Sequence, residues 1–373
     1  MNENIPSQNF PNQNMSINPM NQNMPEHPSR KRNLVILASS LIGVAVLVII
    51  LALVFTGAFN TSNQEDAQKE DNNQSILNQE DRESFPLGTG KYSFSGPIFS
   101  GPMKGAPYFC QSLKKVFQTK IGAHVAGPWI DEKNGVWYPE LRAVVDGENY
   151  WPDAYAKFTV VGNIRKVEIN NLPVGDPTGN FPVAKNDDAY NYDRNPNYVE
   201  AKSIVWEIPR YPEIAKAASC VPLQTVGYAL NGIPLFSAAD GQGRDPAYEV
   251  SDACQGHPGP IHVYHYHIVA GNECIEIGES QSPEKETKLI GYILDGFGIY
   301  SQYENGKELF TSDLDECHGH ISKVLFDGVE KEMYHYHVTR DYPYTISCFK
   351  GTQIDSAVNS KARGMLNMPP IGL

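Results

Sequence analysis

Several common functional signatures are absent from this sequence of 373 residues. It has no Ser-centred nucleophile elbow, no Gly-rich phosphate loop and no His-Glu-x-x-His helix motif, so nothing supports the enzyme classes that these motifs define. An excess of basic residues is also lacking: the formal net charge is −13, whereas binding to phosphate backbones needs a basic face. The sequence therefore indicates no nucleic-acid partner, and it leaves open whether the protein is an enzyme.

Runs that favour helices are scarce after residue 85, where Gly, Pro and aromatic residues alternate in short segments. Two of these segments, residues 157–161 and 165–169, are typical of strands. Residues 174–198 are rich in Asp, Asn, Pro and Tyr and are expected to form a long loop. We therefore predict an all-β, loop-rich domain over residues 85–351, followed by a loosely attached tail over residues 352–373.

One long uncharged apolar segment lies near the N-terminus, and it is long enough to cross a bilayer as a helix. The basic residues 30–32 precede it, which places the N-terminus in the cytoplasm and the remainder outside the cell. We predict a single-pass protein of the cell membrane with a disordered cytoplasmic tail (1–33), a transmembrane helix (34–56) and a flexible stalk (57–84). A cleaved signal peptide is the alternative, although its apolar core is normally shorter.

The β-rich region contains an internal duplication, with repeats near residues 226–274 and 290–348. Each repeat begins with a Gly-Tyr-x-Leu-(Asn/Asp)-Gly segment, and a turn of this kind between apolar runs predicts a hairpin. An Asp-x-Cys-x-Gly-His loop and a Tyr-His-Tyr-His strand follow. We expect the two units to have similar backbones, to pack around a pseudo-two-fold axis and so to bring both histidine pairs together.

Strand geometry predicts the chemistry of the histidines, because residues two apart on a strand point to the same face. The Cα atoms of His265 and His267 are then about 6.5 Å apart, close enough for both imidazoles to reach one ion. His257 precedes this pair, and three imidazoles with an open position form the ligand set of catalytic zinc and also suit copper. The predicted metal ligands are His257, His265 and His267 in the first repeat and His320, His335 and His337 in the second.

Other polar residues near these histidines allow more than one interpretation. Asp252, Asp315 and His318 are candidate ligands, or outer groups that orient an imidazole. A structural alternative is a Tyr–His–Asp hydrogen-bond network that fixes the core, with no metal. His262 has the parity of the tyrosines and is left out of the site.

Six cysteines follow the apolar segment, where an oxidising environment permits disulfides. They allow 15 connectivities, of which the repeat favours Cys254–Cys274 and Cys317–Cys348, leaving Cys110–Cys220. Thiolate ligation of a metal is the alternative, although no Cys-x-x-Cys spacing supports it.

The doubled Tyr-His-Tyr-His motif, the paired hairpins and the Asp-x-Cys-x-Gly-His loops resemble the YHYH domain family. Segments upstream agree in order, and the resemblance covers roughly residues 90–351. These segments are Gly127-Pro-Trp129, Trp151-Pro152, Thr178-Gly-Asn-Phe-Pro182 and Tyr192-Asp-Arg-Asn-Pro196. The resemblance implies a secreted or surface-exposed domain without a defined reaction. Gln255 replaces His318 in the first repeat, so the two sites are not expected to be equivalent.

Two functions remain possible from these observations. The first is a membrane-anchored extracellular domain that binds a transition metal, copper or zinc, through paired His-x-His strands. The second is a surface module that binds a glycan or a protein, in which the His and Tyr side chains are structural. The sequence does not identify the extracellular ligand.

Overall fold

The computed structural model describes residues 82–88, 101–110, 125–240, 243–271, 274–275 and 287–354. The predicted cytoplasmic tail, the transmembrane helix, most of the stalk and most of the C-terminal tail lie outside these residues. Within the described ranges, no helix is long and apolar enough to span a membrane.

The described part of the chain is β-rich and has no α-helix. Four 3-10 turns connect its strands: η1 (Pro139–Leu141), η2 (Asp188–Asn191), η3 (Pro246–Tyr248) and η4 (Thr311–Asp313). The small sheets contain β1 (Phe85–Pro86), β2 (Ile130–Asp131), β3 (Val136–Trp137), β4 (Val144–Val145), β8 (Ile214–Ser219), β11 (Ser251–Asp252), β16 (Tyr303–Glu304), β17 (Lys307–Glu308) and β20 (Phe349–Gly351).

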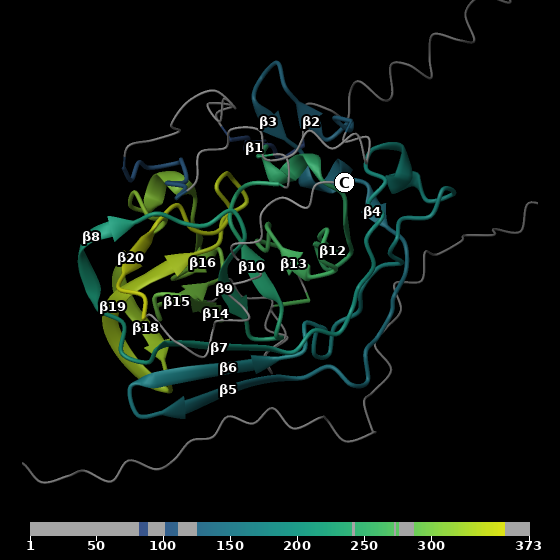
Figure 1. Ribbon diagram of the computed structural model, residues 1–373. Helices are drawn as coiled ribbons and strands as arrows, with labels where there is room; N and C mark the ends of the chain where they lie inside the picture. The colour runs from purple at the N-terminus through teal and green to yellow at the C-terminus, as the bar shows by residue number, and fades with distance from the viewer. Residues whose placement is uncertain are drawn as a thin grey trace, which may run out of the picture. The chain divides into compact units, whose positions relative to one another are not determined.

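An eight-stranded sheet carries both copies of the repeat, in the order β12-β13-β10-β9-β14-β15-β19-β18 (Figure 1). The first copy supplies β9 (Thr225–Ala229), β10 (Pro234–Phe236), β12 (Gly256–Pro258) and β13 (Tyr264–Tyr266). The second copy supplies β14 (Leu289–Ile293), β15 (Gly298–Tyr300), β18 (Gly319–Phe326) and β19 (Val329–His337). Each half of the sheet therefore repeats the strand order of the other half in reverse.

The two halves meet between β9 and β14 in an antiparallel pair whose register is itself symmetric. Tyr228 pairs with Tyr292, its counterpart in the second copy. The Leu230 amide donates to the Ile290 carbonyl at 2.8 Å, and the equivalent bond from Leu294 to Val226 is 2.9 Å long. A pseudo-two-fold relation thus passes between the central tyrosines, as the duplication predicts.

The expectation that this symmetry brings the two histidine pairs together is wrong. Strands β13 and β19 are separated by four other strands of the sheet; β19 contains the second pair, and β13 contains His265 and ends one residue before His267. With neighbouring strands about 4.8 Å apart, the pairs lie about 24 Å apart across the sheet. The reason is that the two copies pair through β9 and β14, the first strand of each copy. Strands β13 and β19 therefore lie towards opposite edges of the sheet.

A second sheet packs against the centre of the first, and its strands are β5 (Ala156–Val161), β6 (Ile164–Ile169) and β7 (Ile204–Pro209). It confirms the strands predicted over 157–161 and 165–169, and the segment 174–198 contains no strand. Trp206 lies against Tyr228 and Phe158 against Tyr292, with ring centroids 6.3 and 5.7 Å apart. This aromatic layer buries the symmetric centre of the main sheet.

All six cysteines are paired, which removes thiolate ligation as an alternative. The disulfides are Cys110–Cys220, Cys254–Cys274 and Cys317–Cys348, the same pairs that the repeat favours. Three disulfides indicate an extracellular or otherwise oxidising location.

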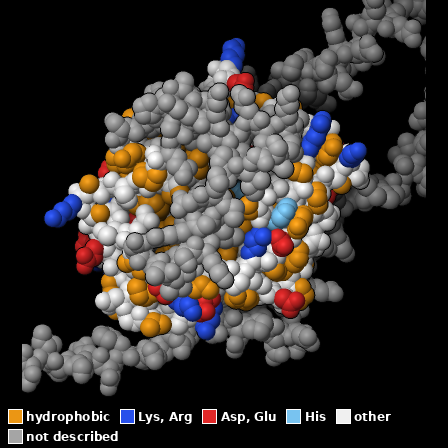
Figure 2. All heavy atoms as spheres, in the orientation of Figure 1, with side chains coloured by type: hydrophobic (Ala, Val, Ile, Leu, Met, Phe, Trp, Pro, Cys, Tyr) orange, Lys and Arg blue, Asp and Glu red, His pale blue; other side chains and the backbone are white. Residues whose placement is uncertain are grey.

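Charges on the described surface are mixed. Figure 2 shows that on the face in view Lys and Arg side chains are dispersed among acidic and hydrophobic ones. The expectation that the chain has no nucleic-acid partner rests on the sequence charge and stays a prediction.

Because β9 and β14 approach closely, a single methyl group added to a glycine of either strand is expected to lower the stability of the fold substantially. A Cβ atom on Gly291 would overlap the Tyr228 carbonyl, and one on Gly227 would lie 2.6 Å from the Tyr292 carbonyl. We expect Gly291→Ala to lower the free energy of unfolding by about 3 kcal/mol, measured by urea denaturation with the disulfides intact. Gly101→Ala is the control, because nothing lies within 4 Å of a Cβ at that position. Equal stability of the two variants would contradict this close packing.

Candidate metal centres

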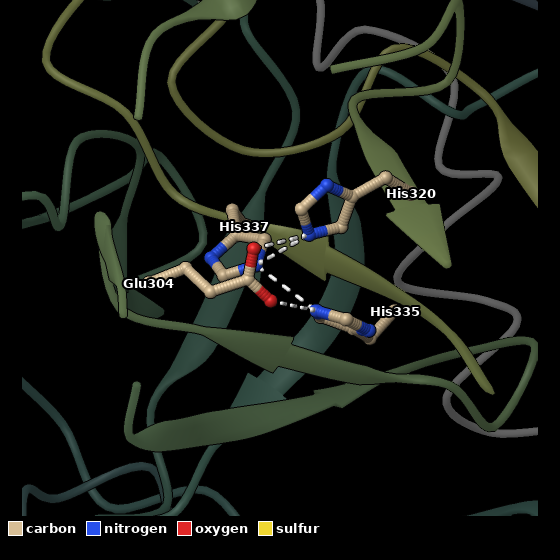
Figure 3. Close-up of side chains that lie close together, drawn as sticks. All are labelled: Glu304, His320, His335 and His337. Carbon is tan, nitrogen blue, oxygen red and sulfur yellow. Dashed lines mark hydrogen bonds and ion pairs between the residues drawn. The ribbon is translucent and has the colours of Figure 1, made fainter. Parts of the chain in front are cut away.

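Two groups of histidines converge, one in each copy of the repeat. The second cluster consists of His320, His335, His337 and Glu304, and Figure 3 shows their side chains directed at one another. The first cluster consists of His257, His265 and His267. All the predicted ligands are thus brought together, three in each half of the sheet.

Strand pairing explains how the third histidine reaches each pair. His257 on β12 lies directly opposite His265 on β13, and His320 on β18 lies directly opposite His335 on β19. Cross-strand partners share one face of the sheet, so their imidazoles stand side by side. The third candidate ligand therefore comes from a paired strand, whereas a loop was expected.

The Nδ1 atoms of the paired histidines donate hydrogen bonds to backbone carbonyls. His265 donates to Val263 at 2.9 Å, and His267 donates to Ser237 at 2.6 Å. The second cluster repeats this arrangement, with bonds of 3.0 Å from His335 to Met333 and 2.6 Å from His337 to Ser301. A carbonyl oxygen only accepts, so each Nδ1 carries the proton and each neutral ring presents a bare Nε2 lone pair.

These bare Nε2 atoms face one another at short distances. His265 and His267 approach to 3.1 Å between their Nε2 atoms. In the second cluster His337 lies 3.0 Å from His335 and 3.2 Å from His320, again between Nε2 atoms. Two nitrogens bound at about 2.0 to 2.1 Å to one ion, at angles of about 90 to 109°, lie about 2.9 to 3.4 Å apart. The observed separations fit a shared ion.

Burial keeps the paired imidazoles neutral. It lowers the pKa of His267 and that of His335 to about 4. Burial also lowers the pKa values of His265 and His337 well below the ordinary value, and the neighbouring histidine in each pair adds to the effect. At neutral pH the rings are therefore unprotonated, which is the form that binds a metal.

Each cluster has a neighbouring carboxylate that the sequence analysis missed. Glu304 on β16 lies 3.3 Å from Nε2 of His320, and its other oxygen lies 3.7 Å from Nε2 of His335. Glu249 follows η3 and lies 3.4 Å from Nε2 of His257 and 3.7 Å from that of His267. A Tyr-Glu pair between the hairpin and the Asp-x-Cys loop of each repeat was the signal that could have identified both.

Asp252 and Asp315 accept hydrogen bonds from loop amides and from tyrosine hydroxyls, and neither belongs to a histidine cluster. Asp252 accepts the amides of Cys254 and Gly256 at 3.0 and 3.1 Å and the Tyr264 hydroxyl at 2.8 Å. Asp315 makes the equivalent contacts, including one of 3.0 Å from the Tyr334 hydroxyl. The bonds found for both carboxylates thus go to their own loops and to the tyrosines, and the roles suggested from the sequence stay predictions.

The hairpin turns do more than reverse the chain, because each binds the second tyrosine of a Tyr-His-Tyr-His strand. Asn231 donates to the Tyr266 hydroxyl at 3.0 Å. Tyr336 donates to Asp295 at 2.6 Å. The tyrosines thus tie the strand to the loop and to the hairpin on one face, while the histidines occupy the other face.

The remaining histidines of this region, His262 and His318, lie outside both clusters. His318 is fully buried and lies outside both clusters, with its Nε2 3.0 Å from the Thr339 hydroxyl. Its φ of 78° matches the φ of 61° at Gln255, so the two residues occupy the same loop position. His262 stacks on Tyr198 at 3.7 Å between ring centroids and faces neither cluster. The candidate role of His318 as a ligand or outer group stays a prediction, and its ring is not part of either group.

Residues 205–311 match the family model described as YHYH protein. The match includes the whole first cluster and Glu304, whereas the other members of the second cluster follow it in the chain. No curated protein and no solved structure matches the chain. The family resemblance is confirmed over this span, which is narrower than the one expected from the sequence.

The burial of Asp295 predicts a dependence of stability on pH. Burial raises the pKa of Asp295 to about 6, although hydrogen bonds from Tyr336 and Gly351 oppose the shift. The unfolded carboxyl has a pKa of about 3.9, so between about pH 4 and pH 6 the folded state binds more protons and stability falls as pH rises. The substitution Asp295→Asn removes this pH-dependent contribution to stability. Asn already occupies the equivalent turn position of the first repeat, at Asn231.

Urea denaturation of the chelator-treated protein at pH 4 and pH 7 measures the effect. The stability advantage of the wild type over the variant is expected to shrink by about 2 to 3 kcal/mol between these two values. Parallel pH profiles of wild type and variant would show that Asp295 is already ionised at pH 4.

Proposed function

We propose that the YHYH family domain of residues 205–311, together with the strands β18 and β19 that follow it, binds two transition-metal ions, one in each histidine cluster. The observation that carries the proposal is the approach of two bare Nε2 atoms in each His-x-His pair, to 3.1 Å in the first cluster and 3.0 Å in the second. Without a cation between them, these lone pairs repel one another in a buried site. An ion converts the same arrangement into a set of favourable bonds.

The outer contacts support the same conclusion. Histidines that bind metals usually donate their other ring nitrogen to a carbonyl or carboxylate, which fixes the tautomer and the direction of the ring. Such a bond to a backbone carbonyl is present in both histidines of each His-x-His pair. Imidazole nitrogens with a nearby carboxylate oxygen suit zinc or copper(II), and we propose one of these as the ion.

The structural alternative accounts for the tyrosines and not for the histidines. The Tyr–Asp bonds form a buried network of the kind that the alternative predicted. This network lies on the tyrosine face and includes none of the converging Nε2 atoms. A glycan- or protein-binding surface stays a prediction from the sequence, and the motif tyrosines cannot supply it because all four are buried.

We also propose that the domain is held outside the cell by the apolar segment over residues 34–56. The three disulfides support an oxidising location, and the cationic residues 30–32 support the proposed orientation.

Elemental analysis of the full chain, purified in detergent, tests the metal proposal. We expect two equivalents of zinc or copper per chain in the wild type and one in the double variant His265→Gln/His267→Gln. His262→Gln is the matched control, a histidine of the same segment outside the cluster, and it should retain both ions. Far-UV circular dichroism establishes that each variant is folded. A folded wild type that holds no stoichiometric metal after incubation with either ion would overturn the proposal.

Fractionation of cells that express the full chain tests the anchor. The full chain should remain in the membrane pellet after carbonate washing, and protease added to intact cells should degrade the part that follows residue 84. Deletion of residues 34–56 should move the protein to the soluble fraction. Release of the full-length chain by carbonate would contradict a transmembrane anchor.

A further inference from the structure

Resting on the proposed metal binding, we infer that the two clusters have different roles. The second cluster closes the coordination of its ion with Glu304, whereas the first cluster leaves one position of its ion open to water or another small ligand. The first cluster would then be the reactive site of the domain and the second a structural one.

The positions of the two carboxylates carry this distinction. Glu304 and its three histidines each offer a ligand atom, and these four atoms all lie within 4.8 Å of one another. The corresponding set in the first cluster contains the three histidines alone. Glu249 approaches His257 and His267 but falls outside the set that includes His265.

Coordination geometry converts this difference into a prediction. Two ligand atoms bound at about 2.1 Å to one ion are separated by at most about 4.2 Å. A carboxylate beyond 4.8 Å from one histidine of the set therefore cannot share an ion with all three in the observed arrangement. Three histidines with a free fourth position form the arrangement of catalytic zinc sites, whereas four protein ligands form that of structural sites.

Buried polar atoms next to the first cluster also differ from their counterparts. Oε2 of Glu249 is buried and accepts no hydrogen bond from the described residues, and the same holds for Oγ of Ser237, whose carbonyl binds His267. In the second copy Ser322 donates to Glu304, and Ser301 Oγ accepts the amide of Lys288. A water or hydroxylic ligand in the open position could donate to Glu249.

The surroundings of the open position limit the size of its ligand. Phe236 stacks on His265 with ring centroids 3.8 Å apart and meets the edge of His267. The side chains of His257 and Glu249 are only 8 and 11 % exposed. A compact monodentate ligand fits such a site, and azide is a suitable probe.

Visible spectroscopy of Co²⁺-loaded full-length variants tests the inference. One variant retains only the first cluster (His335→Gln/His337→Gln) and the other only the second (His265→Gln/His267→Gln). Azide should shift the cobalt bands of the first-cluster variant and bind to it at least about tenfold more tightly than to the second-cluster variant. Adding Glu304→Gln to the second-cluster variant should make it responsive, whereas adding Glu249→Gln to the first-cluster variant should leave the azide shift in place.

The outcomes separate this inference from the proposal on which it rests. If both variants bind one Co²⁺ and respond to azide equally, or only the second cluster responds, the division of roles is overturned and metal binding stands. If neither folded variant nor the wild type binds Co²⁺, the proposed function itself fails.

Discussion

The bonds from histidine Nδ1 atoms to backbone carbonyls are the interactions on which the two sites depend. A free imidazole changes tautomer and rotates, but Val263 and Ser237 accept from one pair and Met333 and Ser301 from the other. These carbonyls belong to the sheet or to the ends of its hairpins, so the fold itself directs each Nε2 inward. Each His-x-His pair therefore holds two Nε2 lone pairs face to face, an arrangement that could bind a metal ion.

The alternation of tyrosine and histidine allows one short strand to serve two purposes. On the tyrosine face, Tyr264 and Tyr334 bond to the loop carboxylates, while Tyr266 and Tyr336 bond to the hairpin turns. On the opposite face the histidines are left to converge. Because successive strand residues point to opposite sides, a shift of one residue in register would exchange the two faces. The tyrosine contacts thus fix the register that the histidine site requires.

Much of this arrangement could be predicted from the sequence, because it depends on local periodicity and on duplication. Residue spacing placed His265 with His267 and His335 with His337, and the repeat gave the disulfide pairs. The contacts between segments far apart in the sequence could not be predicted. The distance between the clusters depends on whether the copies join through their first or their last strands. The observed join brings β9 and β14 so close that a Cβ atom at Gly227 or Gly291 would clash with the neighbouring strand. Glu249 follows a 3-10 turn and Glu304 lies on a two-residue strand outside the main sheet, so sequence spacing relative to the histidines does not determine their positions.

A crystal structure of the protein soaked with zinc, with an anomalous difference map at the zinc edge, would show whether each histidine cluster binds an ion. We expect one peak in each half of the main sheet, within bonding distance of Nε2 in three histidines, with every Nδ1 bond to a carbonyl retained. Histidine rings turned so that their Nε2 atoms diverge, with no anomalous peak between them, would contradict metal binding at these clusters.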